Sequence, residues 1–193
     1  MNALKLPSGW VRSSVLAGIV ISHWGVWSTG AGAVSAAAAV EPQRVFQAEA
    51  RKTRHYLADG VVVGGDSAIQ SVRVKEIRRA ANSEGFERIV IDLQASRADG
   101  EPTALARAPY YQVSINPEER RLIYTITGKP RLDFDAPKVV AAFKKSPVVQ
   151  SVELLPAVHA DQWSFVLNLK SGRPVEVFDL SQPARIITDI RLK

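Results

Sequence analysis

Hydrophobic and polar residues alternate along most of the chain beyond residue 70, in short stretches separated by turn-forming residues. Ile89, Ile91 and Leu93 fall on one side of such a stretch, because successive side chains of a β-strand point to opposite faces. The same alternation is found in residues 71–77, 110–115, 122–127, 163–170, 175–180 and 185–192. This pattern predicts a domain built mainly from β-strands.

Two pairs of these expected strands are joined by turn sequences. Asn116-Pro117-Glu118-Glu119 connects one pair and Ser181-Gln182-Pro183 the other, so each pair is expected to form a hairpin. Residues 61–63, all valine, precede the turn signal Gly64-Gly65-Asp66 and are a candidate edge strand.

One segment, residues 136–145, breaks the alternation and predicts a short helix. Asp135 is a suitable N-cap, Pro137 fits the first turn, and the lysines at the end complement the helix dipole. The residues expected to pack on the sheets are Val139, Ala142 and Phe143.

The strand region contains an internal repeat of four segments. Four strands with one apolar face cannot bury that face alone, so two copies packed face to face predict an all-β, pseudo-symmetric two-sheet β-sandwich with one short helix. The matched segments are 70–74 with 150–154, 86–93 with 162–169, 108–113 with 173–178, and 117–126 with 183–190, the first copy of the last pair carrying two extra residues.

Residues 1–39 have the order of a secretory signal peptide: cations at Lys5 and Arg12, an apolar stretch over residues 15–27, and four alanines at 36–39. The alternative is an uncleaved membrane anchor with Trp24 and Trp27 at the interface. The sequence thus predicts a periplasmic protein that contacts a membrane only through this leader, if uncleaved. Residues 40–69 are interpreted as a linker or an N-terminal extension, and residues 70–193 as the β domain.

The composition limits the kinds of functional site that the chain can form. The chain of 193 residues has no cysteine and three histidines, which argues against disulfides, thiolate metal sites and cysteine nucleophiles. The net charge of +6 falls to +4 once Lys5 and Arg12 are removed, because residues 1–39 carry no acidic residue. No dense basic run accompanies this excess, so nucleic acid is not an expected partner. No metal site, cofactor or catalytic residue is predicted, and the protein is not expected to be an enzyme.

Two stretches point to a known family. Arg-Ile-Val-Ile-Asp-Leu at residues 88–93, a Pro-led strand, and Val-Phe-Asp-Leu-Ser-Gln-Pro-Ala-Arg-Ile-Ile-Thr-Asp-Ile at 177–190 resemble the AMIN domain, over residues 70–193. That family occurs in periplasmic N-acetylmuramoyl-alanine amidases and in type IV pilus secretins. The resemblance implies two symmetric β-sheets and a targeting role through peptidoglycan binding.

Four residues are candidates for ligand contact. Arg88, Arg121 and Arg185 recur at the starts of strands, where a guanidinium can bind carboxylates or sugars or can pair with structural carboxylates. Tyr110 is expected to be the exposed member of the pair with Tyr111. The carboxylates that the arginines are expected to pair with are Asp92, Asp179 and Asp189.

The expected function is therefore a non-catalytic targeting module of the cell envelope that binds peptidoglycan. The alternative is an accessory protein whose sheet edge adds a strand to a protein partner in a secretion or type IV pilus complex.

Overall fold

The computed structural model describes residues 43–193, except residues 82, 83 and 98. Glu41–Lys193 form one compact unit by their internal contacts. The predicted leader, residues 1–39, lies outside the described residues. The one helix among the described residues is too short to cross a membrane.

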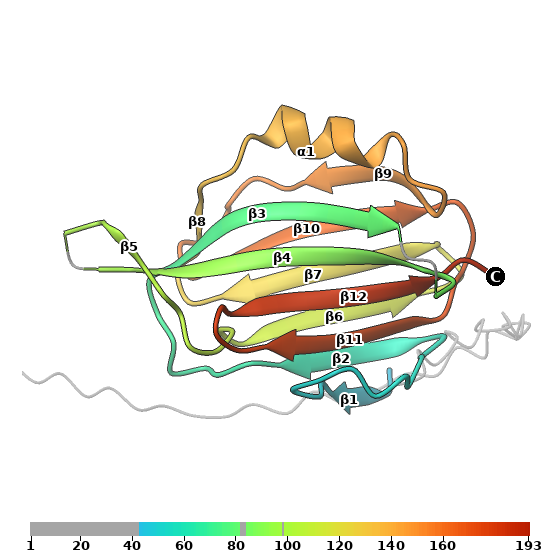
Figure 1. Cartoon of the computed structure of the whole chain (residues 1–193), viewed down its shortest axis with the longest axis horizontal. Coiled ribbons are helices and arrows are strands. Elements are labelled where there is room, and N and C mark those ends of the chain that lie inside the picture. Colours follow the sequence, from blue (N-terminus) through green and yellow to red (C-terminus); the bar gives the residue numbers. More distant parts are fainter. Residues whose placement is uncertain (1–42, 82–83, 98) are drawn as a thin grey trace, which may run out of the picture. The chain divides into compact units, whose positions relative to one another are not determined.

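Two mixed sheets pack face to face, which confirms the predicted all-β sandwich (Figure 1). Sheet A consists, in spatial order, of β1 (Val45–Gln47), β2 (Gly60–Gly64), β6 (Tyr111–Asn116), β7 (Arg121–Thr127), β10 (Gln162–Leu169) and β9 (Val149–Leu154). Sheet B consists of β11 (Val175–Leu180), β12 (Arg185–Arg191), β4 (Phe86–Ser96), β3 (Val72–Ala81) and β8 (Arg131–Leu132), with β5 (Pro102–Thr103) paired to β4. The pairs β1–β2 and β3–β8 are parallel, and the other pairs are antiparallel.

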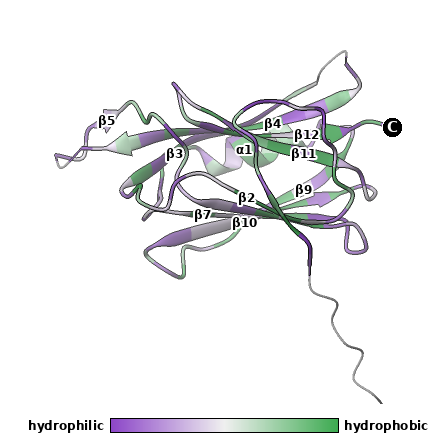
Figure 2. Ribbon diagram, turned by 90° about the horizontal axis from the view of Figure 1, so that it is seen from below, coloured by the Kyte–Doolittle hydropathy of each residue, from purple (hydrophilic) through white to green (hydrophobic). Residues whose placement is uncertain are grey.

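The core lies between the two sheets and follows the predicted alternation. Tyr111, Val113 and Ile115 of β6 are buried, whereas the residues between them are half-buried on the outer face. Figure 2 shows hydrophobic and hydrophilic residues alternating along the strands. The rings of Tyr124 and Phe165 stack with their centroids 4.4 Å apart, next to the buried Trp163.

The two repeats do not each form one sheet, and in this respect the expectation of two copies facing each other is wrong. The first repeat places the hairpin β3–β4 in sheet B and β6–β7 in sheet A, whereas the second places β9–β10 in sheet A and β11–β12 in sheet B. The order β6-β7-β10-β9 in sheet A thus corresponds to β11-β12-β4-β3 in sheet B. Each sheet is completed only by a hairpin from the other repeat.

Two details support this pseudo-twofold relation. Tyr124 and Thr188 hold equivalent positions in β7 and β12, and the Tyr124 hydroxyl donates to Thr188 Oγ1 at 2.9 Å across the core. A bulge with one extra residue occurs at the same place in both repeats, at Lys75 in β3 and at Gln150 in β9.

Strand pairing corrects two segments of the sequence alignment between the repeats. Ile77 pairs with Ile91 as Val152 pairs with Leu167, so residues 150–154 do not correspond to residues 70–74. In the third segment the structural equivalent of Val175 is Tyr111, one residue further than the alignment placed it. The shift of one residue reverses the face of every side chain, so the match in the third segment followed residue types and not the alternation of buried positions.

The predicted helix is α1 (Ala136–Phe143), which lies along the side of the sandwich between the outer strands β3 and β9 (Figure 1). Asp135 is its N-cap, and the carboxylate accepts from the backbone N–H of Lys138 at 3.1 Å. Val139 and Phe143 are buried as expected. Ala142 is exposed, so the expectation that it packs on the sheets is wrong.

Residues 43–69 extend both sheets. β1 and β2 lengthen sheet A, and the three valines lie in β2 as a strand. This strand pairs with β6 on one side and with β1 on the other, so the expectation that it forms the edge is wrong. The segment between them, residues 48–59, runs along the edge of sheet B and is called the β1–β2 connection below. Leu57 and Val175 exchange two backbone hydrogen bonds of 2.7 and 2.8 Å, and Asp179 N–H donates to Glu49 O at 3.1 Å. The β1–β2 connection therefore closes one side of the sandwich.

Candidate functional site

The four residues proposed from the sequence do not form one site. Arg88 and Arg185 lie on the outer face of sheet B, whereas Arg121 lies on the outer face of sheet A. Tyr110 is half-buried just before β6, where its carbonyl accepts from the backbone and hydroxyl of Thr127 at 3.0 Å. The structure therefore brings only two of the four candidates to the same face.

Arg88 forms a bidentate ion pair with Asp189 of the neighbouring strand β12. Arg88 Nε and Nη2 lie 2.7 and 2.8 Å from the two carboxylate oxygens of Asp189, whose side chain is fully buried. The hydrogen bond to Asp189 raises the pKa of Arg88, and partial burial lowers it by less. The guanidinium also lies 5.2 Å from the Phe86 ring centre. Arg88 thus compensates a buried carboxylate.

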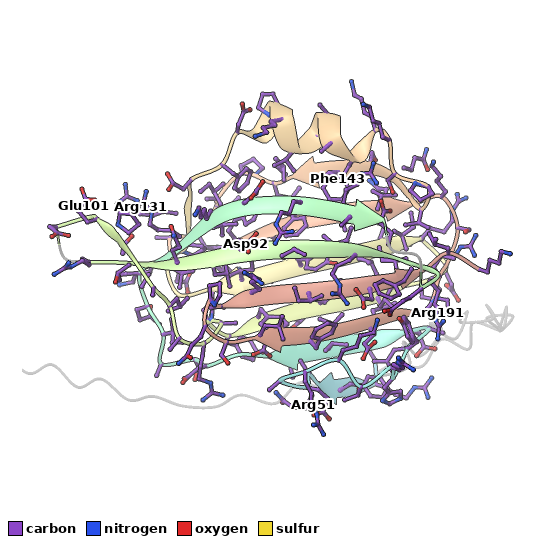
Figure 3. The ribbon with its side chains drawn as sticks, viewed as in Figure 1. Arg51, Asp92, Glu101, Arg131, Phe143 and Arg191 are labelled. Carbon is purple, nitrogen blue, oxygen red and sulfur yellow. The ribbon has the colours of Figure 1, made fainter. Side chains whose placement is uncertain are left out.

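Arg121 and Arg185 occupy equivalent positions of the two repeats and make equivalent contacts. Arg185 Nε donates to Asp92 Oδ1 at 3.0 Å, and Arg121 Nε donates to Asn168 Oδ1 at 3.2 Å. Asp92 also accepts from Arg78 Nε at 2.8 Å. The pairing of arginines with strand carboxylates therefore holds for Arg88 and Arg185. Figure 3 marks Asp92 near the middle of β4.

Asp179 does not follow this pattern, because its hydrogen-bond partner is a tyrosine and not an arginine. Its carboxylate accepts from the buried Tyr111 hydroxyl at 3.2 Å and forms no ion pair among the described residues. The described residues also contain no group of three or more His, Asp or Glu side chains placed to hold a metal ion.

A pocket of about 220 Å³ opens beside Arg88 and combines cations with aromatic rings. Three of its side chains come from different parts of the chain: Tyr56 from the β1–β2 connection, Phe86 from β4 and Arg191 from β12. We call it the basic–aromatic pocket. Its lining residues are Lys52, Arg54, Tyr56, Glu84, Phe86 and Arg191.

Lys52 joins this pocket to the buried carboxylate. Its Nζ lies 2.9 Å from Asp189 Oδ2, 3.5 Å from the Phe86 ring centre and 3.5 Å from a Glu84 carboxylate oxygen. Asp189 therefore has two cationic partners, Lys52 and Arg88, and its charge is more than balanced.

Backbone hydrogen bonds fix this part of the β1–β2 connection on sheet B. The backbone N–H groups of Thr53 and Arg54 both donate to Glu176 Oε1 at 2.6 Å, and the Glu176 side chain is almost fully buried. Arg54 has a positive φ of 64°, which the two hydrogen bonds stabilise. Glu176 of β11 thereby fixes the backbone of residues 53 and 54, from which the Arg54 side chain extends.

Two guanidinium groups are available to a ligand. The Arg191 guanidinium lies over the Tyr56 ring at 4.0 Å from its centre, and within the described part of the chain neither Arg54 nor Arg191 forms an ion pair. Burial, opposed in part by Lys52, raises the pKa of Tyr56, so its phenol remains a neutral hydrogen-bond donor at physiological pH. Cations outnumber carboxylates here: Lys52, Arg54, Arg88 and Arg191 against Glu84, Glu176 and Asp189.

Sequence reasoning missed this pocket because three of its residues lie in the segment interpreted as a linker or extension. The local signal was the run Arg-Lys-Thr-Arg-His-Tyr at residues 51–56, where three cations precede two aromatic side chains. Phe86 and Arg191 join this run only through the tertiary fold.

Comparisons with known proteins do not assign this chain to a family. No protein-family model matches the chain, and the search of curated proteins found no match to its sequence.

Proposed function

We propose that this protein is a non-catalytic binding module of the cell envelope that binds peptidoglycan through the basic–aromatic pocket. The observation that supports the proposal is the pair of guanidinium groups, Arg54 and Arg191, which line a pocket that also contains Tyr56 and Phe86 and form no ion pair among the described residues. A guanidinium binds carboxylates in a planar, bidentate manner, and the neutral Tyr56 hydroxyl can donate a hydrogen bond to a sugar or carboxylate oxygen. Peptidoglycan offers both carboxylates and sugars.

Two further considerations are consistent with this proposal. The leader predicted at residues 1–39 would deliver the domain to the periplasm, where peptidoglycan lies. The resemblance to the AMIN domain implies the same ligand class.

The test is co-sedimentation of residues 41–193, the compact unit, with insoluble purified peptidoglycan at moderate salt. We expect the wild-type unit to sediment and the double variant Arg54→Gln plus Arg191→Gln to lose at least tenfold in affinity, since both free guanidinium groups are removed. Circular dichroism checks that each variant is folded.

A matched control separates specific binding from a general effect of charge. Arg120 is exposed and has a φ of 57°, close to that of Arg54, and Arg131 is an exposed strand residue far from the pocket. Arg120→Gln plus Arg131→Gln removes the same charge and should leave sedimentation unchanged. Equal loss in both double variants, or no sedimentation of the wild type, would overturn the proposal.

A further inference from the structure

Strand β3 has two sides, and only the side that pairs with β4 is hydrogen-bonded along its whole length. On the other side β8 covers its beginning, where Arg73 and Val74 pair with β8 and Val74 O accepts from Asp133 N–H at 2.9 Å. In an antiparallel pair only every second residue directs its N–H and C=O toward the neighbouring strand. The register with β4 therefore directs the backbone groups of Ile77 and Arg79 outward. Neither has a backbone hydrogen-bond partner on that side among the described residues.

A groove of about 360 Å³ runs between this free edge and α1. Its edge side is formed by residues 75–78, and its helix side by Asp135, Lys138, Val139 and Ala142. Arg79 Nε donates to Ala142 O at 2.8 Å and bridges the strand and the helix at one end, while β8 ends the groove at the other. Figure 1 shows α1 beside β3 along this side of the sandwich, and Figure 3 marks Phe143 beneath the helix.

The groove has an apolar floor and balanced charge. Phe134, which packs against Trp163, forms part of this floor with Val139. The exposed methyl group of Ala142 leaves room where a larger side chain would fill the groove. The charged residues balance one another: Lys75, Arg78 and Lys138 against Glu76, Asp133 and Asp135.

These features select one class of occupant. A polyanion gains nothing from a groove whose charges balance, and a small apolar ligand leaves the strand edge unpaired. An extended peptide presents N–H and C=O groups at the two-residue spacing of Ile77 and Arg79. The free edge spans roughly 13 Å, enough for a segment of about four residues in strand conformation.

We propose that the edge of β3 beside α1 binds an extended peptide segment of a partner protein as an added strand. Backbone hydrogen bonds to Ile77 and Arg79 hold the segment, and alternate apolar side chains of the peptide rest on Phe134 and Val139. This site lies apart from the basic–aromatic pocket and shares no lining residue with it.

The first experiment selects binders from a phage-displayed library of random ten-residue peptides on the full-length chain, followed by synthesis of the best sequence. We expect alternating apolar residues in the selected peptides. In the complex, the amide protons of Ile77 and Arg79 should exchange with solvent at least tenfold more slowly than in the free protein. Methylation of alternate backbone nitrogens of the peptide should abolish binding, because it removes the donors that the edge requires.

Two substitutions at neighbouring exposed positions of α1 form a matched pair. Ala142→Trp fills the groove and should weaken peptide binding at least tenfold. Ala141→Trp places the same side chain outside the groove and should leave binding unchanged.

Three results would overturn the proposal: no peptide selected, equal binding by both tryptophan variants, or protection that appears on Val152 and Leu154 of β9 instead of on β3. If Ala142→Trp fails to fold, hydrogen exchange at Ile77 and Arg79 and the binding of the methylated peptide still test the proposal on the wild-type protein.

Discussion

Arg88 and Arg185 form the same kind of ion pair, but the carboxylates that they bind are buried to different degrees. Both lie on the outer face of sheet B and pair with a carboxylate on the adjacent strand. The partner of Arg88, Asp189, is fully buried, whereas Asp92 retains about a fifth of its side-chain exposure and has a second partner in Arg78. The guanidinium of Arg88 is therefore required by the fold.

We predict that Arg88→Ala lowers the free energy of unfolding by roughly 2–4 kcal/mol, because among the described residues it leaves Asp189, a buried carboxylate, with Lys52 as its single ion-pair partner. Arg185→Ala should cost less than about 1 kcal/mol, since Arg78 remains and the pair is partly exposed. Urea denaturation of both variants measures the two values. Equal losses would contradict the distinction between the two sites.

The strands β6 and β11, from opposite sheets, are linked by the hydrogen bond from Tyr111 to Asp179. Burial raises the pKa of the Asp179 carboxyl, and the hydrogen bond from Tyr111 and the charge of Arg107 lower it by less. The folded protein thus holds this proton more tightly than the unfolded chain does. The resulting contribution to stability is complete below the unfolded pKa and is lost as the pH rises through the folded pKa.

From this sign we predict that Asp179→Asn raises the unfolding temperature at pH 7, because the amide can still accept from Tyr111 and carries no charge to desolvate. The gain over the wild type should shrink at pH 3, where the carboxyl is protonated in both states. Thermal unfolding at the two pH values measures this. A larger gain at pH 3 than at pH 7 would contradict the assigned direction.

Most elements could be predicted from alternation and turn chemistry, as the hairpins β6–β7 and β11–β12 show. The short strands β1, β5 and β8, of two or three residues each, are too brief for a period of two to be recognised. The bulge at Lys75 shifts β3 without disturbing its apolar face, so the equivalence of Ile77 and Val152 could not be inferred from the pattern.

The candidate site was only partly predictable. The pairings Arg88–Asp189 and Arg185–Asp92 involve residues on strands that the repeat had already identified. The basic–aromatic pocket depends on the β1–β2 connection lying on sheet B, and that placement is set by backbone groups of Thr53 and Arg54 bound to Glu176. Nothing in the periodicity of residues 48–59 indicates such a contact.

At the scale of the whole domain, the exchange of hairpins makes each sheet depend on both repeats. The central contacts of sheet B join β4 of the first repeat to β12 of the second, and those of sheet A join β7 to β10. A single repeat would leave two hairpins, each with an uncovered apolar face and an unpaired edge.

We therefore predict that residues 41–134 and residues 135–193, produced separately, are both unfolded, and that mixing them restores a native far-UV circular dichroism spectrum. The intact unit 41–193 serves as the reference. Cooperative thermal unfolding of either piece alone would show that one repeat can fold by itself.

The central place of β12 in sheet B, between β11 and β4, also affects the order of events during synthesis. This strand follows the other strands of sheet B in the chain, so a growing polypeptide lacks the middle of that sheet until the ribosome has made residues 185–191. The β3–β4 pair and β11 cannot join into one sheet before then. Synthesis of this middle strand is thus the step at which sheet B closes, with β4 on one side of it and β11 on the other.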